Sequence, residues 1–229
     1  MATEQVKSRA RVAAHGEVFT AEREVKAMCD LVKSETERIE SRFLEPACGT
    51  GNFLAEILSR KLAVVESRYG KSLYEYEKYS IVALSSLYGV ELLPDNASEC
   101  RERLFVIWDR AYTAKLRKKA SLACREAAKY ILDKNILCGD ALTLLANDGS
   151  PLVFAEWSLV TGRMVKRRDF ALGCLLASGN KPASGHAASA TPSLLDYDAS
   201  LEKREMTNRI PLPIREYPLT DYSQVQNHA

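Results

Sequence analysis

Apolar residues recur at two different spacings along the chain, and these predict helices that alternate with strands. The first pattern places four apolar residues at i, i+3, i+4 and i+7, which is one face of an α-helix. These residues are Val25, Met28, Cys29 and Val32. Longer helical stretches follow over about 53–68, 73–87 and 94–133, and short apolar runs at 43–45, 87–92 and 135–142 predict strands. Such alternation is typical of an α/β fold with a mostly parallel sheet.

The stretch 43–54, F-L-E-P-A-C-G-T-G-N-F-L, joins a short strand to a helix through a glycine turn. Glycine permits backbone angles that residues with a Cβ avoid, and it lets a ligand approach bare main chain. Asn52 is predicted to cap the helix after the turn, and Thr20 the helix before the strand. A strand, a glycine turn and a helix form the nucleotide cradle of open α/β folds. A tight turn without a ligand is the alternative interpretation.

The residues around this turn favour a cationic ligand over a phosphate. The sequence has no third glycine in phase and no Gly-Lys-Ser/Thr of a P-loop. Glu45 ends the strand instead, and its carboxylate repels phosphate. A carboxylate suits the sulfonium, amine and ribose of S-adenosylmethionine.

Two further strands also end in an acid. Glu91 closes the run Leu87–Leu92, where it would accept the two hydroxyls of a ribose. Asp140 closes the next strand, where it would accept the exocyclic amine of an adenine, with Leu92 and Ala141 flanking the ring. Each acid alone is a common residue at a strand end. The order and spacing of the three predict one site.

The net charge, the cysteine spacing and the absence of a long apolar run limit which kinds of protein and site the sequence can form. The net charge is only +2, so contact with nucleic acid requires a local patch or a partner. The six cysteines form no C-x-x-C pair, which argues against zinc and a secreted disulfide framework, and no metal site is predicted. The polar N-terminus is no signal peptide and no run is apolar enough to span a membrane. We therefore expect a cytoplasmic protein without a membrane partner.

The motif E-P-A-C-G-T-G-N-F-L resembles the first motif of N6-adenine-specific DNA methyltransferases of restriction-modification systems. Y-G-V-E-L at 88–92 and G-D-A-L at 139–142 resemble the second and third motifs, and 16–20 resembles the segment upstream, although Ala21 replaces the usual Pro. The resemblance covers roughly 15–170. It implies a Rossmann-like class I methyltransferase with a doubly wound, mostly parallel sheet, S-adenosyl-L-methionine as cofactor and DNA as substrate.

The resemblance also implies which residues bind the cofactor. They are Thr20, Glu45, Pro46, Ala47, Cys48, Gly49, Gly51, Asn52, Phe53, Glu91, Leu92, Asp140 and Ala141.

The sequence departs from the family at the catalytic motif, Asn/Asp-Pro-Pro-Tyr/Phe, which should stack the flipped adenine and bind its amine. No Asn-Pro-Pro occurs, so the catalytic residues are unknown; Asn180-Lys181-Pro182 and Thr191-Pro192-Ser193 are the nearest shapes. Val153-Phe154 could be the fourth strand, which would bring Glu156-Trp157-Ser158 beside the cofactor. Trp157 is then either a stacking platform or a buried core residue. The basic trio 166–168 either contacts phosphates or faces water.

Two functional hypotheses remain. The chain is a complete adenine methyltransferase with an atypical fourth motif, or it is a cofactor-binding or degenerate module that needs a second restriction-modification subunit for base capture. Methylation of RNA, protein or a small molecule is a third, which the Pro-Ala-Cys form of the first motif disfavours. Residues 1–175 are predicted to form the methyltransferase domain, and 176–229 a linker and an irregular, extended tail.

Overall fold

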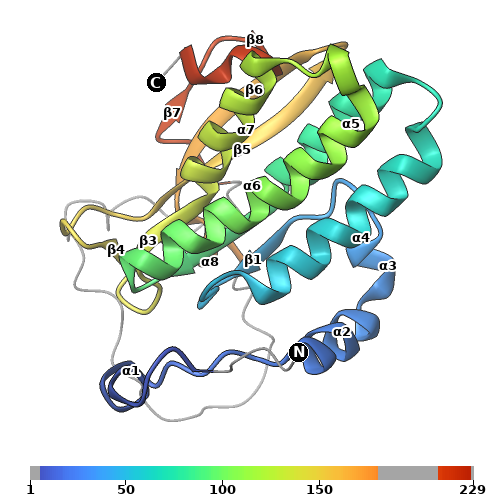
Figure 1. Ribbon diagram of the computed structural model, residues 1–229. Helices are drawn as coiled ribbons and strands as arrows, with labels where there is room; N and C mark the ends of the chain where they lie inside the picture. Colours follow the sequence, from blue (N-terminus) through green and yellow to red (C-terminus); the bar gives the residue numbers. More distant parts are fainter. Residues whose placement is uncertain (1–5, 180–210, 228–229) are drawn as a thin grey trace, which may run out of the picture.

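The computed structural model describes residues 6–179 and 211–227. Its helices and strands alternate through the first two thirds of the chain (Figure 1). The helices are α1 (Arg9–His15), α2 (Glu22–Leu31), α3 (Lys33–Thr36), α4 (Asn52–Tyr69), α5 (Leu73–Ser85), α6 (Pro94–Leu116), η1 (Arg117–Lys119), α7 (Leu122–Asn135), α8 (Leu172–Gly179) and η3 (Tyr222–Asn227). The strands are β1 (Phe43–Glu45), β2 (Leu87–Glu91), β3 (Ile136–Asp140), β4 (Leu145–Ala146), β5 (Val153–Thr161), β6 (Met164–Ala171), β7 (Arg215–Glu216) and β8 (Thr220–Asp221).

The first sheet has the strand order β1-β2-β3-β4, in which β1, β2 and β3 are parallel and β4 is antiparallel to β3. Long helices connect the parallel strands, as a parallel crossover requires. Figure 1 shows α4, α5, α6 and α7 side by side on one face of these strands. The prediction of an α/β protein with a parallel-rich sheet is therefore confirmed.

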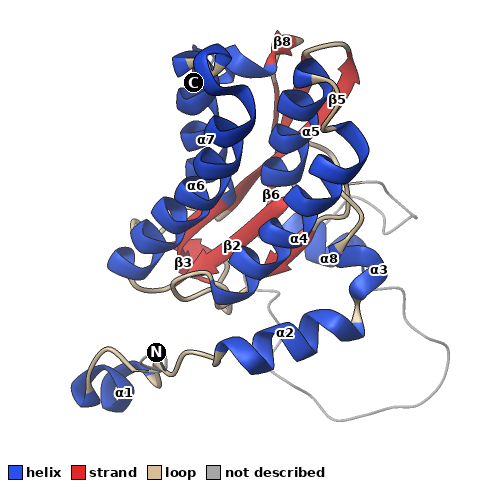
Figure 2. Cartoon of the chain, turned by 45° about the vertical axis from the view of Figure 1, so that its right-hand side comes forward, coloured by secondary structure: helices blue, strands red, loops and turns tan. Residues whose placement is uncertain are grey.

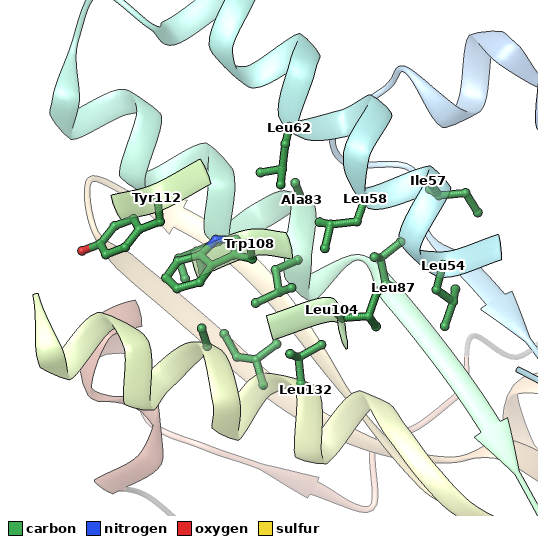
Figure 3. Close-up of a cluster of buried hydrophobic side chains, with 14 of the residues drawn as sticks. Leu54, Ile57, Leu58, Leu62, Ala83, Leu87, Leu104, Trp108, Tyr112 and Leu132 are labelled. Carbon is green, nitrogen blue, oxygen red and sulfur yellow. The ribbon is translucent and has the colours of Figure 1, made fainter. Parts of the chain in front are cut away.

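The largest part of the core lies between these helices and the first sheet. Leu54, Leu58 and Leu62 follow one face of α4 at intervals of four residues and are almost completely buried. Figure 3 shows them in one cluster with Leu104 and Trp108 of α6. Because the buried indole donates its Nε1 hydrogen to Ser80 Oγ at 3.2 Å, the ring is buried without an unpaired polar group.

The second sheet is antiparallel, which the sequence analysis did not predict. β5 pairs with β6 along its length, and β6 also pairs with β7 and β8. Val153-Phe154 does begin a strand, but it pairs with β6 and not with the first sheet. The chain between β3 and β5 contains only turns and β4, which is too short for the crossover that a parallel fourth strand needs. Gly162, at φ 55°, instead turns the chain back into a hairpin.

The C-terminal segment 211–227 is more regular than predicted. It supplies β7, β8 and η3, and it lies at the end of the molecule opposite to α1 and α2 (Figures 1 and 2). Tyr222 is 1% exposed, and its hydroxyl donates to Glu77 Oε1 at 2.9 Å. The predicted linker was wrong at its start, because residues 176–179 belong to helix α8. Its remainder and the two near-matches to the catalytic motif, from Asn180 to Ser193, lie outside the described residues.

Candidate cofactor site

The parallel register brings the three predicted acids to one edge of the first sheet. Glu45 pairs with Gly89 of β2, and Glu91 pairs with Cys138 of β3, two residues before Asp140. Parallel strands end at the same edge, so the three carboxylates meet at their C-terminal ends. All three line one cavity of about 570 Å³, within the ~300–1,000 Å³ typical of small-molecule sites.

The charged residues that line this cavity are all acidic. They are Glu17, Glu45, Glu91 and Asp140, and the described lining contains no Lys, Arg or His. Burial raises the pKa of Glu45, while the N–H of Ala47 opposes the shift. Arg11 hydrogen-bonds Glu17 and lowers its pKa. The cavity therefore presents a negative potential that attracts cations and repels phosphates.

The two glycines of the turn have different roles. Gly49, at φ 53°, donates its N–H to Glu91 Oε2 at 2.9 Å and lines the cavity. Gly51, at φ 83°, does not line it. A Cβ at Gly51 would lie 2.6 Å from Cys100 Sγ, so this glycine allows α4 to start against α6. Gly51 is the one predicted cofactor residue that does not line the cavity.

The predicted helix caps are both wrong. The N-cap of α4 is Gly51, and Asn52 is already the first helical residue; the N-cap of α2 is Ala21, one residue after Thr20. Asn52 Nδ2 instead donates to the Thr20 carbonyl at 2.9 Å, and Asn52 Oδ1 accepts from Arg103. Asn52 thus fixes the segment before α2 against the glycine turn, and both residues line the cavity.

The carboxylate of Glu91 is already engaged by the protein. Its Oε1 accepts from the N–H of Leu93 at 3.0 Å and from Asn96 Nδ2 at 3.3 Å, and its Oε2 accepts from Gly49. A carboxylate has about four acceptor sites. One strong site remains, on Oε2, so the second hydroxyl of a ribose would need another acceptor.

The wall formed by the N-terminal segment contains residues that the sequence prediction missed. Glu17 accepts from Asn96 Nδ2 at 2.6 Å and forms an ion pair with Arg11. Asn96 is 1% exposed and also accepts from Lys7 Nζ at 2.8 Å. The acid inside the Gly-x-x-Phe-Thr segment was the available signal for Glu17. Asn96 gave none, because two of its partners, Glu17 and Lys7, are 79 and 89 positions away in the sequence.

The other residues that line the cavity include the end of β3 and the residues that follow β2 and β3. Asp140 Oδ1 accepts the N–H of Leu142 at 2.8 Å, and Oδ2 has no hydrogen bond with the described residues. Leu92 is half exposed, and Ala141 stands beside Asp140. Additional lining residues that were not predicted as cofactor-binding are Gly16, Val18, Phe19, Leu93, Asn96, Gly139 and Leu142.

The segment Glu156-Trp157-Ser158, which the sequence analysis considered as an atypical catalytic motif, does not line this cavity. Trp157 is 9% exposed and donates its Nε1 hydrogen to Asn135 Oδ1 at 2.9 Å, so it is a core residue and no stacking platform. Glu156 pairs with Arg42 and Arg168, both at 2.6 Å. The basic trio is paired within the protein, because Lys166 contacts Glu216, Arg167 contacts Asp169 and Arg168 contacts Glu156. Arg167 is buried, whereas the side chains of Lys166 and Arg168 are 33% and 38% exposed, so these two partly face water; their contact with phosphates stays a prediction.

Two negative findings concern other kinds of site. Within 6–179 and 211–227, three or more His, Cys, Asp or Glu side chains nowhere gather as a metal site would require. Among the helices described, none has the length and apolar character of a transmembrane span.

The chain was compared with protein families, curated proteins and solved structures. No curated protein matches the chain, and no solved structure does. Residues 20–156, more than half of the chain, match the family model described as MmeI, DNA-methyltransferase domain. The match begins at Thr20 on the cavity wall and includes the ends of β1, β2 and β3. The chain therefore belongs to the MmeI DNA-methyltransferase domain family, a family of restriction-modification DNA methyltransferases.

Proposed function

We propose that the chain binds S-adenosyl-L-methionine in the acidic cavity, for methylation of the N6 amine of adenine in DNA. The observation that carries this proposal is the lining itself: four carboxylates, no basic side chain and the bare backbone of Gly49. The sulfonium and amine of the cofactor are cationic, so this charge favours it over a nucleotide phosphate. When bound, the cofactor supplies an electrophilic methyl group.

Seven of the predicted residues have assigned roles in this proposal. Glu45 and the backbone near Thr20 face the methionine end, while Glu91 Oε2 accepts one ribose hydroxyl. Asp140 Oδ2 accepts the adenine amine, and Leu92 and Ala141 flank the ring. Gly51 acts indirectly, because it holds α4 against α6. Adenine specificity is supported by the Pro-Ala-Cys and Phe-Leu of the first motif.

The parallel sheet supports a Rossmann-like fold. In doubly wound sheets, ligands bind where the strand order reverses, next to the first strand. β1, β2 and β3 have the order expected for one half of such a sheet, with the cofactor cavity at the end of β1. We infer that the chain contains the cofactor half of a class I methyltransferase.

A second candidate function is a cofactor-binding module that depends on a partner subunit for base capture. It is favoured by the position of Glu156, Trp157 and Ser158, which do not line the cavity. The described lining also lacks the Asn-Pro-Pro-Tyr arrangement that would bind the adenine amine.

Calorimetric titration of the intact chain tests the proposal. We expect saturable heat with S-adenosylmethionine and none with ATP, because the carboxylates repel phosphate. Glu45→Gln should weaken binding about tenfold, or about 1.4 kcal/mol, while Glu40→Gln, an exposed acid outside the cavity, should leave it unchanged. Absence of heat with S-adenosylmethionine well above micromolar concentration would reject the proposal, as would tighter binding of ATP.

A further inference from the structure

Two of the carboxylates that line the acidic cavity are held by a single amide. Asn96, in the first turn of α6, lines the cavity and donates from Nδ2 to Glu17 Oε1 at 2.6 Å and to Glu91 Oε1 at 3.3 Å. An amide nitrogen has two hydrogens, one for each acid. Glu17 precedes the residues that match the family, whereas Glu91 ends β2 within them. Asn96 therefore fixes a carboxylate of the N-terminal segment beside the carboxylate that is assigned to the ribose.

Each of these two carboxylates keeps one open acceptor site. Main-chain N–H groups and Asn96 occupy three sites of Glu91, which leaves one on Oε2. In Glu17, Asn96 and Arg11 Nη2 occupy Oε1, and Arg11 Nε occupies one site of Oε2. Because a carboxylate has about four acceptor sites, one site on Glu17 Oε2 also stays without a donor among the described residues. The pair thus offers two acceptors, one from each acid.

Arg11 keeps Glu17 in its ionised form. The guanidinium hydrogen-bonds the carboxylate, which lowers the pKa of Glu17 although burial opposes this shift. The Glu17 side chain is 6% exposed, and Asp95 accepts from Arg11 Nη1 at 2.7 Å and so holds the guanidinium from α6. An ionised carboxylate only accepts hydrogen bonds, so its open site requires a donor. Two neighbouring hydroxyls supply one donor for each acid.

We propose that Glu17 accepts one hydroxyl of a ribose and Glu91 accepts the other, so that this ribose clamp selects ribonucleosides over deoxyribonucleosides. It rests on the proposed function, in which S-adenosylmethionine brings the ribose. A ligand without one hydroxyl leaves one enclosed carboxylate site unpaired, which is unfavourable. Asn96 is a positioning residue that sets the separation of the two acceptors. The nucleosides of DNA lack the 2′-hydroxyl and are therefore disfavoured in the cavity.

Calorimetric titration of the intact chain with S-adenosylmethionine and its 2′-deoxy and 3′-deoxy analogues tests the ribose clamp. The native chain should bind each analogue about tenfold more weakly than S-adenosylmethionine, because each analogue leaves one carboxylate unpaired. In Glu17→Met, S-adenosylmethionine and the analogue that lacks the Glu17-bound hydroxyl should bind equally, since the acceptor of that hydroxyl is gone. The other analogue should stay about tenfold weaker, because Glu91 is intact.

Lys7→Met is the matched control. Lys7 Nζ donates to Asn96 Oδ1 at 2.8 Å and to Glu99 Oε2 at 2.5 Å, so the substitution loosens the same segment and leaves both carboxylates in place. It should weaken all three ligands by one common factor and preserve the selection against each analogue. Circular dichroism confirms that both variants are folded.

The proposal is overturned if the native chain binds S-adenosylmethionine and either analogue equally. It is also overturned if Glu17→Met still discriminates against both analogues, which would give Glu17 a structural role only. A parallel titration with adenosine and its 2′-deoxy and 3′-deoxy forms omits the methionine half of the cofactor. Selection for adenosine without binding of S-adenosylmethionine would reject the proposed function and leave the ribose clamp standing. Binding of S-adenosylmethionine without selection among the sugars would do the reverse, and binding of no ligand would reject both.

Discussion

At the residue scale, two glycines with nearly equal φ angles have very different surroundings. Gly51 has φ 83° and Gly149 has φ 81°. A Cβ at Gly51 would lie 2.6 Å from Cys100 Sγ, whereas a Cβ at Gly149 would meet nothing within 4 Å. Substituting Ala at each glycine therefore separates two losses of stability: the loss from a left-handed backbone, which both positions share, and the loss from a steric clash, which only Gly51 has.

We expect Gly149→Ala to lower the free energy of unfolding by about 1–2 kcal/mol, the cost of the backbone angle alone. Gly51→Ala should lower it by about 2–4 kcal/mol, because the clash with Cys100 adds to that cost. Urea denaturation measures both. Adding Cys100→Ala should restore part of the loss at Gly51 and none at Gly149. Equal losses in the two single variants would show that close approach of α4 to α6 is unimportant.

Lys61 is a buried lysine that contacts Phe43 of the first strand. It is 0% exposed; its Nζ donates to the carbonyls of Ile39 and Ser41 and to Ser86 Oγ, and it lies 5.1 Å from the ring centroid of Phe43. Burial lowers the pKa of Lys61 from 10.5 to about 7. Between these values the unfolded chain binds more protons than the folded chain, so stability rises with pH.

We therefore expect the free energy of unfolding of the native chain, relative to Lys61→Met, to rise from pH 7 to pH 9 by up to about 1.4 kcal/mol per pH unit. Denaturation of both proteins at several pH values measures this slope. Lys71→Met, at an exposed lysine, is the control and should run parallel to the native chain. A flat difference between the native chain and Lys61→Met would mean that Lys61 keeps an ordinary pKa when folded.

The sequence predicted a site residue well when its role follows from its neighbours in the chain, and poorly when its partner is far away in the sequence. Glu45, Glu91 and Asp140 each end a short apolar run, and the parallel register then brings them together. Thr20 and Asn52 were assigned to caps because both side chains favour that position. The Asn52 side chain bonds instead to the carbonyl of Thr20, 32 residues away, and sequence spacing does not reveal such a bond.

At the element scale, the C-terminal segment is held by a buried polar cluster. Arg163 in the β5–β6 turn contacts Glu77 of α5 and Asp221 of β8, each at 2.7 Å. Tyr222 and Tyr112 also donate to Glu77. Three distant elements thus share one carboxylate, which explains how a segment without apolar periodicity becomes ordered.

We expect Tyr222→Phe to lower the free energy of unfolding by about 1–2 kcal/mol, because it removes one buried hydrogen bond to a charged group. Tyr74→Phe, at a tyrosine 43% exposed, should change it by less than about 0.5 kcal/mol. Chemical denaturation compares the two. If the variants are equally stable, the cluster does not hold the C-terminal segment.

Elements were predicted well where helical or strand patterns are long. The stretches 53–68 and 73–87 correspond to α4 and α5 within two residues at each end. The hairpin of β5 and β6 was missed because 153–154 was interpreted as a strand by itself. Gly162, directly after the run 153–161 that is rich in β-branched and aromatic residues, was the signal for a turn. The domain boundary at residue 175 stays a prediction.

At the scale of the whole molecule, the described residues contain the acidic cavity, which is the proposed cofactor site, and the parallel strands β1, β2 and β3. We expect the purified chain alone to bind S-adenosylmethionine and to transfer no radiolabelled methyl group to unmethylated DNA. The reason is that the described residues present no base-binding group at the cavity. Transfer by the single chain, abolished by Glu45→Gln and retained in Glu40→Gln, would show that the chain is a complete enzyme.

The wall of the cavity is assembled from two parts of the chain that are synthesised far apart in time. Lys7 and Arg11 reach Asn96 and Asp95, which lie 89 and 84 positions later. During translation the N-terminal arm therefore leaves the ribosome long before the start of α6 exists. A product released early, although it already contains the whole glycine motif and the Asn52–Thr20 hydrogen bond, would lack the partners of Lys7 and Arg11. The contacts that hold this wall of the cavity therefore form only after α6 has been synthesised.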